Sequence, residues 1–127
     1  MNNKMLIVTH GLLGSALIDV AGKIIGDFET GCLTAISNEN LSTTELAGRI
    51  RSATESDPDS FYILATDFPG GSCFIASRKV ASASGRIMSV SGLNISMILS
   101  FLTKRELYPG MQLVEIIKTD GNRAILS

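Results

Sequence analysis

One stretch near the start of the chain decides the fold: residues 5–25, which read MLIVTHGLLGSALIDVAGKII. Its first five residues form a short apolar run, which is typical of a strand buried on both faces of a sheet. Directly after it, apolar side chains recur at helical spacing, at Leu13, Ala16, Leu17, Val20 and Ile24. Gly26 then ends the predicted helix. The stretch therefore predicts a buried strand that leads straight into a helix.

The same alternation continues along the chain. Short apolar runs predict further strands at residues 32–36, 61–65 and 86–90. Between the first two of these, Ser42 and Glu45 have the spacing of a capping box, which predicts the start of a helix that Asp57-Pro58 ends. Another helix is expected after the turn at residues 69–72, and a further one from the shared apolar face of Met97, Ile98, Phe101 and Leu102.

The last part of the chain begins with a break at Pro109-Gly110. A final helix is expected around Leu113, Ile116 and Ile117, and Asp120-Gly121 is expected to turn the chain into residues 123–126, which could form a fifth strand. Alternating strands and helices predict an α/β fold: an open, mainly parallel sheet with helices on both faces. We expect it to form a single domain, residues 1–127.

Composition excludes several classes of function. With 18% charged residues and a net charge of −1, the chain has no basic cluster, so no nucleic-acid partner is expected. No clean secretory signal and no run of about 18 apolar residues is present, so a cytoplasmic protein is expected. Cys32 and Cys73 have no metal-binding spacing and we interpret them as reduced thiols. Since His10 is the only histidine, a His-based metal site is not expected. No metal ligands and no cofactor are predicted.

Polar residues follow three of the predicted strands. They are Thr9-His10-Gly11, then Asp67 with Gly70-Gly71-Ser72 behind it, and Gly92-Leu93-Asn94. Ligands of open α/β sheets bind beyond the carboxyl ends of the strands, so these segments are expected to meet at one edge.

His10 is the strongest candidate for chemistry at that edge. A neutral imidazole is a nucleophile near neutral pH, and one ring nitrogen can attack phosphorus while the other donates to a carboxylate. Asp67 is the natural carboxylate, which would fix the tautomer and stabilise a positive ring. The alternatives are that His10 only caps a helix or fills a gap, and that Asp67 is a helix cap.

The Gly70-Gly71-Ser72 turn is a candidate anion site. Glycines let backbone amides face a ligand, and the start of a helix carries partial positive charge. We predict that Thr9, Gly71 and Ser72 bind phosphate beside His10. Ser72 could instead serve only as the N-cap of the helix.

Two other classes of protein carry some of these features. A response-regulator receiver also has an aspartate after its third strand, but it needs an acidic pair after the first strand, where this chain has Thr9-His10. A hydrolase could use Ser72, His10 and Asp67, but residues 70–74 lack the last glycine of a nucleophile elbow.

The whole chain resembles the enzyme IIA component of the mannose-type (mannose/fructose/sorbose) sugar phosphotransferase system. The matching pieces are Ile7-Val8-Thr9-His10-Gly11, Asp67 ahead of Gly70-Gly71-Ser72, and residues 92–97, Gly-Leu-Asn-Ile-Ser-Met. The resemblance implies that His10 is phosphorylated and that Asp67 orients it. It implies a histidine phosphocarrier protein as donor, an enzyme IIB as acceptor and an indirect association with the membrane through the sugar permease.

The resemblance also implies a homodimer in which the last strand, here residues 123–127, lies antiparallel in the partner's sheet. The chain departs from the family where Pro69 replaces Trp, Cys73 replaces Pro and Ser96 replaces Pro, positions that shape the rim of the site. The phosphocarrier subunit of dihydroxyacetone kinase is a related alternative with a different second motif. A non-catalytic regulatory module of the same fold is another.

Overall fold

The strand expected at the start of the chain lies inside the sheet of the computed structural model, which describes residues 2–127. Within these residues the strands are β1 (Asn3–Thr9), β2 (Leu33–Ser37), β3 (Phe61–Thr66) and β4 (Ile87–Val90). The helices are α1 (Leu13–Ile25), α2 (Thr43–Glu55), α3 (Ser72–Ser82), α4 (Ile95–Lys104) and α5 (Gly110–Arg123). The predicted alternation of strand and helix is confirmed.

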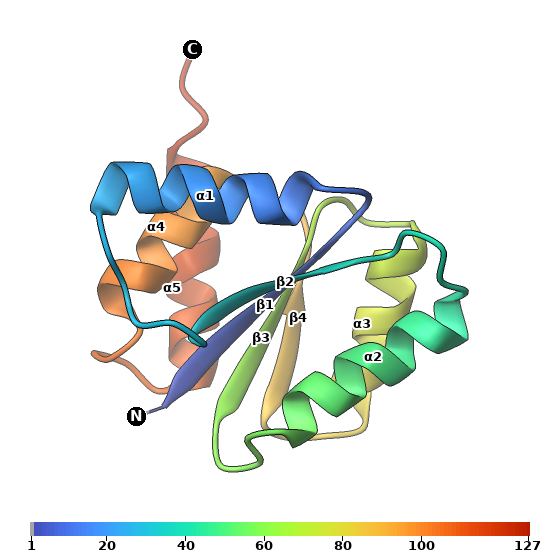
Figure 1. Cartoon of the computed structure of the whole chain (residues 1–127). Coiled ribbons are helices and arrows are strands. Elements are labelled where there is room, and N and C mark those ends of the chain that lie inside the picture. Colours follow the sequence, from blue (N-terminus) through green and yellow to red (C-terminus); the bar gives the residue numbers. More distant parts are fainter. Residues whose placement is uncertain (1) are drawn as a thin grey trace.

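All strand pairs in the described residues are parallel, and the order across the sheet is β2-β1-β3-β4. Helices α1, α4 and α5 cover one face of the sheet, and α2 and α3 cover the other (Figure 1). The expectation of an open parallel sheet with helices on both faces is confirmed.

The apolar run in β1 is buried on both faces because it lies between two helical layers. Met5 and Ile7 point into the core under α1, α4 and α5, whereas Leu6 and Val8 point into the core under α2 and α3. Each of these four side chains is at most 4% exposed. Such double burial is what makes a strand of a parallel sheet continuously apolar.

Capping residues fix where two of the helices begin. Ser42 accepts a hydrogen bond from the Glu45 N–H at 3.1 Å while the Glu45 carboxylate accepts one from the Ser42 N–H at 2.9 Å, so the predicted capping box is confirmed. At the start of α4 the Asn94 side chain accepts from the Met97 N–H at 3.0 Å.

The apolar stripe that predicted α1 lies largely on the outside of the molecule. Leu13, Val20 and Ile24 are 47%, 42% and 57% exposed, whereas Gly14 and Ala21 are buried. The small residues therefore sit against the sheet, and the helix keeps an apolar outer face.

The turn expected at Asp120-Gly121 is wrong. Both residues belong to α5, which continues to Arg123. Gly121 is needed for packing, since a Cβ there would lie 2.5 Å from Cγ of Met97. Residues 124–127 form no strand within this chain, and their pairing in a partner's sheet remains a prediction. None of the helices described in residues 2–127 has the length and apolar character needed to cross a membrane.

Candidate functional site

The sheet order places His10 and Asp67 next to each other. Strands β1 and β3 are neighbours with Val8 opposite Thr66, so the residues that follow them leave the sheet side by side. This is where the strand order reverses, because β2 lies on one side of β1 and β3 on the other. In open α/β sheets that reversal opens a crevice in which ligands bind.

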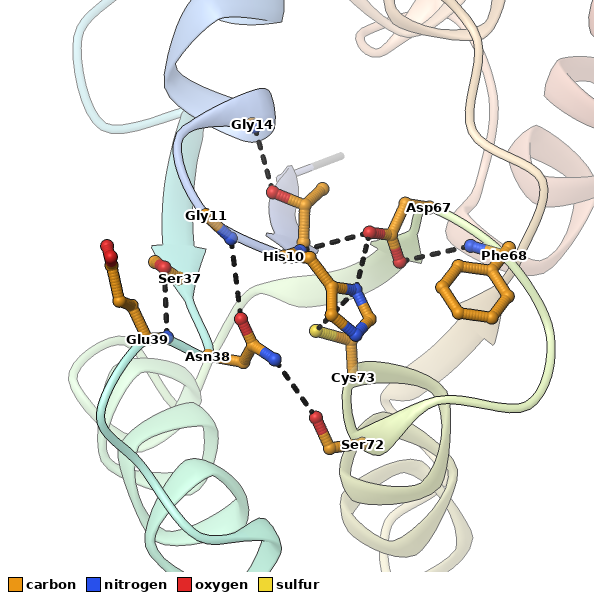
Figure 2. A network of polar contacts seen from close by, with 11 residues as sticks. His10, Gly11, Gly14, Ser37, Asn38, Glu39, Asp67, Phe68, Ser72 and Cys73 are labelled. Atoms are coloured by element: carbon orange, nitrogen blue, oxygen red, sulfur yellow. Dashed lines mark hydrogen bonds and ion pairs between the residues drawn. The ribbon is translucent and has the colours of Figure 1, made fainter.

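The Asp67 carboxylate contacts both the backbone and the imidazole ring of His10 (Figure 2). One carboxylate oxygen, Oδ2, accepts from the His10 backbone N–H at 3.0 Å and contacts ring Nδ1 at 2.8 Å. The other oxygen, Oδ1, accepts from the Phe68 N–H at 3.0 Å. The predicted pairing of His10 with Asp67 is thus present in the geometry.

These hydrogen bonds keep Asp67 ionised. Burial raises the pKa of Asp67, but the hydrogen bonds from the His10 backbone, the His10 ring and the Phe68 N–H together outweigh it, so the pKa is lowered from its usual value. Since an ionised carboxylate can only accept, the Nδ1 that faces it carries a proton, and Nε2 of a neutral ring keeps its lone pair.

The outer nitrogen of His10 faces the start of α3. An added Cβ on Gly71 would lie 2.9 Å from His10 Cε1, 3.2 Å from His10 Nε2 and 3.2 Å from Phe68 Cζ. The backbone of Gly71 has φ −91° and ψ −177°, which any residue can adopt. Glycine is therefore required at this position for space beside the ring and not for backbone conformation.

Phe68 packs against the imidazole. Its ring is stacked on that of His10 with centroids 5.2 Å apart and an interplanar angle of 28°. The Phe68 side chain remains 49% exposed and that of His10 43%. The ring of His10 is therefore fixed by Asp67 on one side and Phe68 on another, yet it can be reached from outside.

Ser72 and Asn38 form a second polar link at the site. The Asn38 amide donates to the Ser72 hydroxyl at 3.2 Å, and the Asn38 carbonyl oxygen accepts from the Gly11 N–H at 3.4 Å. The alternative that Ser72 is an N-cap is wrong, because the N-cap of α3 is Gly71 and Ser72 is the first helical residue. Asn38 was missed in the sequence, although it follows β2 at the same edge as His10.

Thr9 and Asn94, which the sequence placed among the polar residues after the strands, make their hydrogen bonds away from the ring of His10. The Thr9 side chain is buried, and its hydroxyl accepts from the Gly14 N–H at 2.8 Å, so it holds the start of α1. Asn94 caps α4 and donates to the carbonyl oxygen of Gly121 at 3.3 Å. Within the described residues Thr9 therefore positions the strand end, and its hydroxyl is turned away from the site.

Cys73 lies directly beneath the imidazole. Its sulfur is 3.8 Å from His10 Nδ1, and its side chain is buried. Burial, together with the negative charge of Asp67, raises the pKa of the Cys73 thiol to about 11. The thiol is therefore neutral near pH 7 and does not compete with Asp67 for the ring proton.

The chain is thus an α/β protein with an open parallel sheet and a histidine–carboxylate pair at the carboxyl edge of that sheet. A model of the family described as "PTS system fructose IIA component" (EIIA-man) matches residues 4–118, and the chain belongs to this family. It is a IIA-type component of the sugar phosphotransferase system, whose members are phosphotransfer components. A search of the curated proteins found no match.

Solved structures share the fold at low sequence identity. Component EIIA from Streptococcus agalactiae is 22% identical, with a TM-score of 0.86 over 98% of this chain and 96% of that one. The IIA protein associated with the fucose utilization operon of Streptococcus pneumoniae is 17% identical, with a TM-score of 0.84 over 100% and 93%. The mannose/sorbose-specific IIA subunit from Enterococcus faecalis is 15% identical, with a TM-score of 0.79 over 100% and 95%.

Proposed function

We propose that the chain carries a phosphoryl group on Nε2 of His10, taken from a phosphorylated histidine phosphocarrier protein and passed to an enzyme IIB. The observation that carries the proposal is the Nδ1 contact to Asp67 at 2.8 Å, which leaves Nε2 as the free nucleophile. In the first transfer the Nε2 lone pair forms a bond to phosphorus. The donor's N–P bond breaks, and its electron pair returns to the donor nitrogen.

Asp67 stabilises the ring as it becomes phosphorylated. Attack through Nε2 makes the imidazole positive, and the carboxylate next to Nδ1 offsets that charge. The transferred group would then lie at Gly71 and Ser72, where the first amides of α3 have no partner inside the helix. We include Gly71 and Ser72 in the phosphate site and assign the Thr9 hydroxyl to positioning.

Protein partners are consistent with the surroundings of His10. Leu12 is 75% exposed and Phe68 is 49% exposed, and both follow strand ends at the same edge as the imidazole. Exposed apolar side chains around a reactive group are typical of a protein docking surface. We place the carrier in the cytoplasm, with a membrane link only through the sugar permease.

The homodimer expected from the family resemblance is retained as a proposal. The outer edge of β4 has no strand partner among residues 2–127, and a groove lined by Ser89, Val90 and Asn122 runs beside it. Ile125 and Leu126 are 77% and 87% exposed at the end of the chain. If the tail of one copy pairs with the sheet of a second copy, the edge of β4 gains hydrogen-bond partners and the apolar side chains of the tail are buried.

The test uses radiolabelled phosphocarrier protein and the variant His10→Ala. Wild-type chain should take up acid-labile, base-stable label, and the variant should take up none, because the chain has a single histidine. Circular dichroism serves as the control that the variant is folded. Normal labelling of the variant would show that the acceptor is another residue, and an unlabelled wild type would indicate a non-catalytic module of the same fold.

A further inference from the structure

Three side chains of types that bind metals, those of His10, Asp67 and Cys73, lie close together at the site. Nδ1 of His10, a carboxylate oxygen of Asp67 and the sulfur of Cys73 all lie within 4.8 Å of one another. They come from the end of β1, the end of β3 and the first turn of α3 (Figure 2). Sequence spacing predicted no metal site, because the fold alone joins residues that are as much as 63 positions apart.

We propose that this cluster binds a divalent transition metal, with zinc as the best match, and that metal binding and phosphorylation of His10 exclude each other. An imidazole, a thiolate and a carboxylate are the side-chain groups that zinc uses in proteins. The thiolate disfavours magnesium and calcium, which prefer all-oxygen sites. Three protein ligands leave a fourth position for water, as in zinc sites that remain open.

Two of the three ligand separations lie near those of a tetrahedral site, and the third, between Cys73 Sγ and an Asp67 oxygen, lies within 4.8 Å. Bond lengths of about 2.0–2.3 Å imply ligand separations of roughly 3.5 Å for nitrogen and sulfur and roughly 3.4 Å for nitrogen and oxygen. The structure has 3.8 Å between Cys73 Sγ and His10 Nδ1, and 2.8 Å between His10 Nδ1 and Asp67 Oδ2. The imidazole therefore has to move by about half an ångström away from Asp67.

The site can accommodate that movement. The His10 side chain is 43% exposed, so its ring is not enclosed by the core. Asp67 keeps its position, because the backbone N–H groups of His10 and Phe68 hold its two oxygens at 3.0 Å each. Only the hydrogen bond between Asp67 and the ring has to be replaced by coordination.

Coordination changes which ring nitrogen is reactive. A metal on Nδ1 displaces the proton there, and a neutral ring then carries its proton on Nε2; the Cys73 thiol gives its proton to solvent. A protonated Nε2 has no lone pair to attack phosphorus. Conversely, phosphorylated Nε2 leaves the proton on Nδ1, facing Asp67. This exclusion rests on the proposed phosphoryl transfer, whereas the metal site itself does not.

The first experiment titrates the full, unphosphorylated chain with Co²⁺. A thiolate ligand should give a thiolate-to-cobalt charge-transfer band in the near ultraviolet, and added Zn²⁺ should bleach it. Cys73→Ser should remove the band, while the matched variant Cys32→Ser should keep it, because Cys32 precedes β2 at the opposite end of the sheet. Absence of the band in the wild type, or its survival in Cys73→Ser, would overturn the proposal.

The second experiment tests exclusion, using purified phosphorylated donor so that no other enzyme is exposed to zinc. Each protein is compared with itself, with and without saturating Zn²⁺. The wild type should be labelled at least about tenfold more slowly with zinc, and Cys73→Ala should show a ratio near one. Equal rates in the wild type would refute exclusion. If no protein accepts label even without zinc, the proposed function fails, and the cobalt result still decides the metal site.

Discussion

Replacing Gly71 by alanine should separate phosphoryl transfer from stability. The new Cβ would lie 2.9 Å from His10 Cε1 and 3.2 Å from Nε2, where ordinary contacts are 3.4–4 Å. The imidazole must therefore shift by roughly 0.5–1 Å, and a misplacement of that size can cost up to about 10²-fold in rate. We expect transfer to His10 to fall by about 10- to 100-fold, or about 1.4–2.7 kcal/mol in activation free energy.

The fold should tolerate the same change. The backbone of Gly71 has φ −91° and ψ −177°, so alanine adds no strain there. The loss of unfolded-state entropy favours the variant, and the contact with the half-exposed ring opposes it. We therefore expect the free energy of unfolding to change by less than about 1 kcal/mol.

The assay is a rapid-quench measurement of label passing from the phosphorylated donor to the chain, with urea unfolding in parallel. Gly48→Ala is the matched control, because Gly48 lies inside α2 and a Cβ there meets nothing within 4 Å. It should label like the wild type and unfold with a free energy about 0.5–1 kcal/mol higher. A wild-type rate in Gly71→Ala would refute the assignment of this space to the reacting phosphoryl group.

Three more variants test the site and the assembly. Asp67→Asn keeps the shape but loses the charge that faces Nδ1 of His10, so transfer should slow by about 10²-fold in the rapid-quench assay, with the fold intact; an unchanged rate would reduce Asp67 to a structural role. Ser72→Ala should slow transfer only a few-fold, since the backbone amide remains; a loss as large as that of Asp67→Asn would show that the hydroxyl itself is required. Deleting residues 125–127, which leaves α5 complete, should convert a dimer to monomer in sedimentation; a full-length chain that is monomeric at micromolar concentration contradicts the assembly.

Patterns that depend on local physics predicted the fold well. The apolar run before His10 indicated a strand buried on both sides, and the capping box at Ser42 and Glu45 indicated where a helix begins. The parallel arrangement then required the segments that follow β1 and β3 to emerge at one edge. Element order therefore predicted that His10 and Asp67 lie at the same edge of the sheet, whereas their direct contact depends on β1 and β3 being neighbours, which only the structure shows.

The failures come from contacts between elements distant in sequence. Gly121 next to an aspartate is typical of a turn, but it lies inside α5, where the absence of a side chain leaves space for Met97. The apolar stripe that predicted α1 did not reveal that its outward part is exposed, since Gly14 and Ala21 allow the helix to approach the sheet. Asn38 carries no local signal beyond its place after a strand, and only the fold sets it beside Ser72.

The two hydrogen bonds between Asp67 and His10 link the position of the ring to that of the carboxylate. The same carboxylate oxygen is hydrogen-bonded to the backbone and to the ring of a single residue. If a protein docked here and displaced the surrounding loops, the His10 ring and Asp67 would be expected to move together. Under the proposed function, this linkage would keep the geometry of His10 and Asp67 unchanged while the surrounding loops adapt first to the donor and then to the acceptor.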